Sequence, residues 1–180
     1  MAAFLFISYF VYYREMKPAL NVPYYSQFLD VANPFWMVRA CGATSLKMVA
    51  EYQGKEVPGI IALCDEAKER GGYDMSNGWM HDYLVLRAGE LGLKAYRLEG
   101  LSDMTEIAAS LKESNPVIVS VEKRILEQTK FHMIVIVGCE DGKVMYHEPE
   151  STDRERGAYR ICDEGTFMSY WRGKAIFISQ

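Results

Sequence analysis

Residues 131–139 read FHMIVIVGC, an apolar run that begins beside His132 and is hydrophobic enough to form a central β-strand. The run lies in the second half of the chain, where apolar segments of strand length recur. A helix in this half is expected to open at the capping-box sequence Asp103-Met104-Thr105-Glu106 and to extend to about Glu113. We expect strands over 93–98, 117–121, 131–139, 144–148 and 175–179.

The first half of the chain has a helical period instead. Within 42–53 the apolar residues fall on one helical face, and Gly54 supplies the stop. Further helices are expected from about residue 59 to Arg70 and from about Gly78 to Leu91. Helices followed by antiparallel strands predict an α+β fold, in which a helical half faces a sheet half across a groove.

Length and charge limit the function. The 180 residues are enough for one domain with a core, which we place at 21–180. The net charge is −4, and the cations are not clustered, so nucleic acid is not an expected partner. The short stretches Lys123-Arg124 and Arg154-Glu155-Arg156 are expected in solvated loops.

The first 20 residues form a separate apolar segment. Residues 2–13 (AAFLFISYFVYY) carry no charge, but they are too few to span the hydrocarbon core of a bilayer, which takes about 20 residues. The segment is either an element packed on the domain or the remnant of an export signal or membrane-surface anchor. Localisation therefore stays open: we favour the cytoplasm, with export or membrane association through 2–13 as the alternatives.

Four cysteines occur, at positions 41, 64, 139 and 162. No two lie two to four residues apart, so the sequence predicts no zinc site, and no metal or other cofactor is expected. The thiols are expected to be reduced.

Cys41 and His132 form a candidate nucleophile and base. Cys41 stands at the start of the helix predicted over 42–53, and a helix N-terminus stabilises a thiolate. Taken alone, such a cysteine is more often a small buried hydrophobe, and a histidine at the mouth of a strand can be a half-buried structural residue. Together they predict a thiolate–imidazolium pair, which requires only that the two side chains meet in space.

Glu148 is the candidate third group, and strand parity tests it. If 140–142 forms a two-residue Asp-Gly turn, Glu148 faces away from His132; if it forms a three-residue loop with a left-handed Gly142, Glu148 lies opposite Ile134 and diagonal to His132. We predict the three-residue loop, with Glu148 accepting a hydrogen bond from the His132 ring.

Gln27 is the candidate oxyanion donor. An acyl-transfer site needs preorganised donors for the tetrahedral intermediate, and the side-chain amide of Gln27 and the backbone N–H of Cys41 are suited to this role. A glutamine in a loop is otherwise more often solvated.

Four segments together carry a resemblance to a known family: Val22–Gln27, Cys41–Leu46, His132–Gly138 and Tyr146–Pro149. From about Val22 to Ile178 the chain resembles the cysteine peptidases typified by the bacteriocin-processing, double-glycine leader peptidases and the standalone domains related to them. The resemblance implies a papain-like fold with the active site between the two halves.

The resemblance also implies roles for single residues. The family glutamine falls on Gln27, the nucleophile on Cys41, the base on His132, and the usual aspartate is replaced by Glu148. The chain departs from the family in its longer segment between Gln27 and Cys41. No transporter domain accompanies the domain, so a role in bacteriocin export is not expected.

The expected function is therefore that of a cysteine-type peptidase, a hydrolase that cleaves a peptide or protein substrate through an acyl-enzyme. A thiol acyltransferase or transpeptidase is one alternative, and a catalytically silent peptide-binding module of the same fold is another. A thiol redox protein is disfavoured because no cysteine lies close to Cys41 in the sequence. Other residues considered for the groove are His147, Trp36, Trp79, Tyr24 and Tyr25, whereas His81 is expected on a helix surface.

Overall fold

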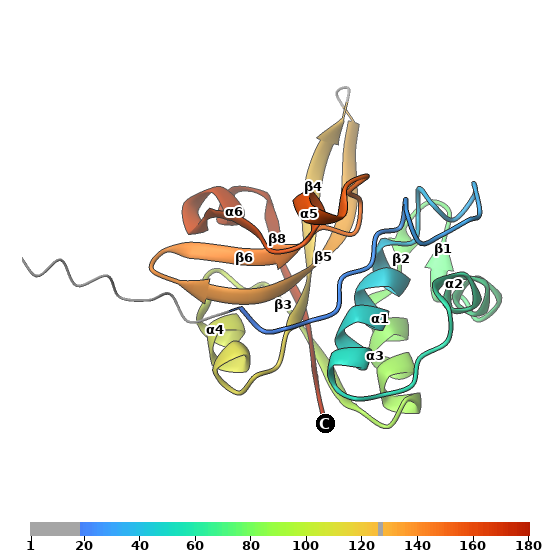
Figure 1. Cartoon of the computed structure of the whole chain (residues 1–180), viewed down its shortest axis with the longest axis horizontal. Coiled ribbons are helices and arrows are strands. Elements are labelled where there is room, and N and C mark those ends of the chain that lie inside the picture. Colours follow the sequence, from blue (N-terminus) through green and yellow to red (C-terminus); the bar gives the residue numbers. More distant parts are fainter. Residues whose placement is uncertain (1–18, 126–127) are drawn as a thin grey trace, which may run out of the picture.

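The computed structural model describes residues 19–125 and 128–180 (Figure 1). Most of the apolar segment 1–20 lies outside the described residues, so its predicted packing or anchoring role is not addressed. None of the helices in the described ranges has the length and apolar character that crossing a membrane requires.

The helical half precedes the sheet. It consists of α1 (Cys41–Tyr52), α2 (Ile60–Glu69) and α3 (His81–Glu90), with a small hairpin of β1 (Tyr73–Asp74) and β2 (Gly78–Trp79) between α2 and α3. Three helices were expected here, but the third begins at His81 rather than at Gly78. The reason is that Gly78 adopts a positive φ of 77° and pairs with Asp74 in the hairpin.

The sheet half is one antiparallel sheet with the strand order β3-β8-β4-β5-β6-β7. The last strand in the chain, β8, therefore lies in the interior of the sheet, between β3 and β4. The strands are β3 (Lys94–Glu99), β4 (Val117–Ile125), β5 (Gln128–Glu140), β6 (Lys143–His147), β7 (Arg160–Asp163) and β8 (Trp171–Ser179).

Three helices accompany the strands: α4 (Thr105–Lys112), α5 (Arg154–Gly157) and α6 (Glu164–Tyr170). Residues 154–156 are exposed, as expected, but they form a short helix rather than a loop, because Asp153 accepts a hydrogen bond from the Arg156 N–H and caps it. Figure 1 shows α1, α2 and α3 on one side of the molecule and α4 and α6 on the other, with the β4–β5 hairpin projecting beyond both.

The stretch 133–137 is apolar throughout because both faces of β5 are buried there. Met133, Val135 and Val137 pack in the core shared with the helical half, while Ile134 and Ile136 pack in the second core beneath α4 and α6. Alternate residues of a strand point to opposite faces, so a strand between two cores has no polar face. The predicted α+β fold, with a helical half facing an antiparallel sheet half, is confirmed.

Candidate active site

The fold brings Cys41 and His132 to one groove. Cys41 is the first residue of α1, and His132 lies on β5, the strand against which α1 packs. Both side chains line a groove of about 250 Å³ and are mostly buried. No side chain caps the N-terminus of α1, so the backbone N–H groups there are left for a ligand or for the thiolate.

His132 is held between two partners. Its Nε2 donates to the Oε1 atom of Glu148 at 2.5 Å, and Cys41 lies close enough to the ring to influence its protonation. Burial disfavours the imidazolium, but the Glu148 carboxylate and the contact with Cys41 outweigh burial and raise the pKa of His132 to about 9. The ring is therefore protonated at neutral pH.

Glu148 reaches His132 by a route that the sequence did not suggest. The β5–β6 turn is the two-residue type, with Glu140 paired to Lys143 and with positive φ at Asp141 and Gly142, so the predicted three-residue loop was wrong. A β-bulge between Ile136 and Gly138 then shifts the register by one residue.

The bulge returns Glu148 to the face of His132, whereas the two-residue turn alone would have placed it on the opposite face. Beyond it Val135 pairs with His147, so the next residue, Glu148, lies opposite Ile134, on the same face as His132. The extra residue of the bulge is Val137, and its carbonyl accepts a hydrogen bond from the Leu20 N–H at 2.8 Å. The orientation predicted for Glu148 is present, although its cause is the bulge.

Lys123 completes the charge network, and sequence reasoning missed it. The Nζ atom of Lys123 lies 3.0 Å from Glu148 Oε2 and 2.7 Å from Glu150 Oε2. It was expected in a solvated loop, but β4 continues through it and leaves it half-buried at the groove. Burial of Glu148 favours the neutral acid, yet His132 and Lys123 outweigh it and lower the pKa of Glu148 to about 2.

Gln27 also lines the groove. Its side chain is buried, its Nε2 donates to the carbonyl of Met37 at 3.0 Å, and its backbone N–H donates to the carbonyl of Pro149 at 2.8 Å. An amide nitrogen carries two hydrogens, so one N–H of Nε2 is left for a ligand. The longer segment between Gln27 and Cys41 thus leaves Gln27 at the groove.

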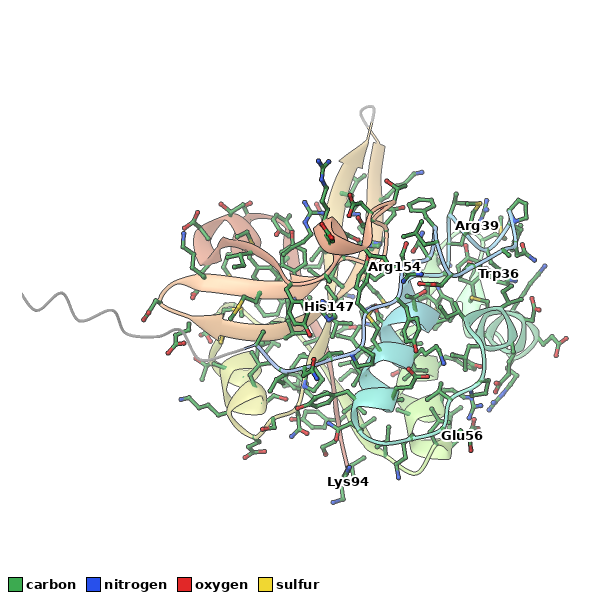
Figure 2. All side chains as sticks on the ribbon, viewed as in Figure 1. Trp36, Arg39, Glu56, Lys94, His147 and Arg154 are labelled. Carbon is green, nitrogen blue, oxygen red and sulfur yellow. The ribbon has the colours of Figure 1, made fainter. Side chains whose placement is uncertain are left out.

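The remaining candidates divide between groove and core. Trp79 and His81 line the groove, and burial lowers the pKa of His81 to about 4, with neighbouring Lys174 and Arg172 acting in the same direction. His147 was expected at the groove, but it is fully buried, with Nε2 donating to the Val22 carbonyl and Nδ1 accepting from Tyr159 N–H (Figure 2).

The other three aromatic candidates have structural contacts. Trp36 is buried and donates through Nε1 to Asp65, Tyr25 donates to Glu51, and the Tyr24 hydroxyl donates to the backbone carbonyl of Glu148. They do not line the groove that contains Cys41.

Gly42, the residue after Cys41, has no room for a side chain. A Cβ atom there would lie 2.4 Å from the Trp79 ring, so the space beside Cys41 is filled by Trp79. The Trp79 Nε1 donates to the Arg39 carbonyl at 2.7 Å, which fixes the ring.

Comparison with protein families supplies the identity. The model of the Peptidase C39 like family matches residues 19–174. The chain belongs to the Peptidase C39 like family. A comparison with curated proteins gave no match.

Solved structures agree with this C39-like assignment. The chain is similar to the peptidase domain of Streptococcus ComA, a bi-functional ABC transporter involved in quorum sensing, with 23% identity, a TM-score of 0.60, and coverage of 79% of this chain and 92% of that one. A Bacillus anthracis protein described as a C39-like peptidase gives 18% identity, a TM-score of 0.65, and coverage of 91% and 98%. A double glycine motif protease from an AMS/PCAT transporter, solved with the leader peptide, gives 18% identity, a TM-score of 0.62, and coverage of 91% of this chain and 96% of that one.

These likenesses confirm the papain-like fold of the C39-like chain and the family resemblance of its motifs. Family and fold support a cysteine peptidase-like function. The roles assigned to Cys41, His132, Glu148 and Gln27 stay predictions. In residues 19–125 and 128–180, no group of three or more His, Cys, Asp or Glu side chains is placed to hold a metal ion.

Proposed function

We propose that this chain is a cysteine peptidase that hydrolyses peptide bonds, with Cys41 as nucleophile, His132 as general base and acid, and Glu148 as the group that orients His132. One observation carries the proposal: a buried imidazole stands between a carboxylate at 2.5 Å and a cysteine at a helix N-terminus. This is the nucleophile–base–orienter arrangement of covalent catalysis.

The charges suit the reaction. Because Glu148 keeps His132 protonated at neutral pH, the imidazolium stabilises a thiolate on Cys41. The thiolate sulfur attacks the scissile carbonyl carbon, the C–N bond breaks, and the imidazolium protonates the leaving amine. His132 then takes a proton from water, whose oxygen attacks the acyl-enzyme and releases Cys41.

The oxyanion has two donors within this scheme. The backbone N–H of Cys41 lies at the uncapped N-terminus of α1, and the second N–H of Gln27 Nε2 is available at the same groove. Both are held before substrate binds, as electrostatic stabilisation of the intermediate requires. Lys123 is a positioning residue, since it binds the Glu148 oxygen that faces away from His132.

The substrate class is a peptide. The AMS/PCAT protease, which shares the fold, was solved with a leader peptide. The groove of this chain is open and lined by residues of both halves, so an extended chain can cross Cys41.

Selective alkylation tests the proposal. Iodoacetamide at about pH 6, followed by intact mass measurement and peptide mapping, should label Cys41 ahead of the other three cysteines. Burial raises the pKa of the Cys64 thiol, with Cys41 and Asp65 adding to the rise, so Cys64 serves as the internal standard for an inert thiol. The variant His132→Ala should lose the preference, and Cys64→Ala should keep it.

Peptide hydrolysis completes the test. Wild type should cleave members of a quenched-peptide library, and Cys41→Ala should cleave none. The cleavage assay is repeated with an added amine, which would accept the acyl group if the chain were an acyltransferase. Preferential labelling of Cys41 with no cleavage under either condition would favour a peptide-binding module. Uniformly slow labelling of all four cysteines would refute the activated pair.

A further inference from the structure

A second β-bulge places Arg172 at the groove. Along the β4–β8 pair, Ser120 is opposite Lys174 but Val121 is opposite Trp171, so Arg172 and Gly173 are extra residues on β8. Gly173 has a positive φ of 63°, which only glycine adopts readily. Bulges re-aim side chains, and here Arg172 joins the lining of the groove that contains Cys41 and His132.

The Arg172 guanidinium is fixed but not neutralised. Its Nη1 donates to Ser120 Oγ at 2.8 Å, and its carbon atom Cζ lies 3.5 Å from the centre of the Phe131 ring. An arginine has five N–H donors, and Arg172 uses one on a side chain within the described part of the protein. In the same part, no carboxylate lies within ion-pair distance of it; Glu122 and Glu99 act on it only from farther away.

Phe131 gives this cation an apolar neighbour that solvent reaches. Its side chain is next to His132 in sequence and is 55% exposed at the edge of the groove. An exposed ring with a guanidinium stacked on it offers a substrate side chain both an apolar surface and a fork of donors.

The rest of the groove carries the same sign of charge. Arg39 and Lys130 also line it, and within 19–125 and 128–180 neither has a carboxylate at ion-pair distance (Arg39 is labelled in Figure 2). The one carboxylate among the lining residues, Glu150, is already paired with Lys123. A chain with a net charge of −4 thus presents a cationic groove.

The groove continues past Arg172. A second hollow shares Asn77, Trp79, His81, Phe131 and Arg172 with the first, so Arg172 stands at the junction. The cations beyond it, Arg97 and Lys174, are paired with carboxylates. Of the three cations along this path in the described residues, Arg172 lines the groove with Cys41 and His132 and has no carboxylate at ion-pair distance, whereas the other two are paired.

We propose that Arg172 is a specificity-determining residue that binds the carboxylate of an Asp or Glu side chain on the peptide substrate, close to the scissile bond. The methylene groups of that side chain lie on Phe131, and the carboxylate takes the donors of Arg172 that the protein leaves unused. The inference rests on the proposed peptidase function and adds an acidic peptide as its substrate class.

Matched peptide pools test the inference. Internally quenched peptides are prepared in paired pools, one pair for each position near the scissile bond. In each pair, one pool has Glu fixed at that position and the other has Gln there. At one position wild type should cleave the Glu pool about 10-fold faster than the Gln pool, the size expected for a charge-assisted hydrogen bond. Arg172→Gln should bring this ratio to about 1, and Arg172→Lys should give an intermediate ratio because lysine keeps the charge but not the fork.

The control is Arg156→Gln, an exposed arginine outside the groove, which should keep the wild-type ratio. Raising the salt concentration should lower the wild-type ratio, which tests the charge without any variant. A wild-type ratio near 1 at every position, or an Arg172→Gln variant that keeps the Glu preference, would overturn the inference.

The same pools separate this inference from the proposed function. They are added as competitors of Cys41 alkylation by iodoacetamide, which requires binding but no hydrolysis. Stronger protection by a Glu pool, lost in Arg172→Gln, with no cleavage would support acidic recognition while refuting the peptidase. Equal protection by the Glu and Gln pools, or none by either, would overturn acidic recognition whether or not peptides are cleaved.

Discussion

Replacing Glu148 with Gln should remove most of the reactivity of Cys41 while keeping the shape of the site. The side chains of His132 and Glu148 are only 5% and 6% exposed, so water does little to screen their interaction. The pKa of His132 is about 9 against an ordinary value of 6.5. Since one pKa unit corresponds to about 1.4 kcal/mol, the imidazolium is stabilised by about 3 kcal/mol in this setting, and Glu148 is its largest favourable contributor.

The assay is the second-order rate constant for alkylation of Cys41 by iodoacetamide at about pH 6. At that pH few ordinary thiols are ionised, because their pKa is about 8.5. Loss of the carboxylate leaves burial as the dominant influence on His132, so the rate constant should fall by between about 10-fold and about 100-fold. Glu150→Gln is the matched control, because the Glu150 carboxylate also pairs with Lys123, whereas the carboxylate bonded to the His132 ring is that of Glu148.

A folded Glu148→Gln variant that reacts at the wild-type rate would refute the role given to Glu148. Circular dichroism and thermal denaturation establish that the variant is folded. If Glu150→Gln lost as much reactivity, the effect would belong to the charge network as a whole.

Three further predictions concern stability and register. Gly42→Ala should lower the free energy of unfolding by about 1–3 kcal/mol in chemical denaturation, because the new methyl group meets the Trp79 ring. Deleting Val137 removes the bulge and turns Glu148 to the other face, so alkylation of Cys41 should slow in a folded variant as much as in Glu148→Gln. The difference in unfolding free energy between wild type and Glu148→Gln should be largest between about pH 4.5 and 6.5. In this range Glu148 is ionised and His132 is protonated in the folded and the unfolded chain alike, so their attraction in the folded chain contributes fully to stability. The difference should shrink as the pH rises through the His132 pKa of about 9, and also as the pH falls toward the Glu148 pKa of about 2.

Much of the fold followed from periodicity. The helix after Cys41 and the strands around 131–139 were predicted within a few residues, because amphipathic helices and doubly buried strands leave clear patterns. β7 was missed because its burial is slight: along Arg160–Asp163 only one residue is even half-buried. A strand at a sheet edge has little apolar pattern to detect.

The site shows a different limit. The parity argument for Glu148 assumed that the register set at the turn holds along the whole hairpin. Gly138 was the available signal, since a glycine inside an apolar strand often marks a bulge, and a Cβ there would lie 2.6 Å from the Met145 side chain. Lys123 could not be placed at the site from the sequence, because its position depends on how β4 pairs with β5. In the structure Val121, two residues before Lys123, is opposite His132, and this register is set by the three-dimensional pairing of the strands.

The position of β8 has a consequence for when the groove can be assembled during synthesis. Between the start of β3 and the arrival of β8 the ribosome makes most of the sheet, yet β3 and β4 are joined only through β8. The helical half and the β4–β6 strands leave the exit tunnel without that closing strand, and Arg172 lies on β8 itself. Long-range pairing of this kind makes folding wait for distant sequence. A nascent chain that still lacks β8 therefore carries Cys41 and His132 in an incomplete sheet, and its groove lacks Arg172.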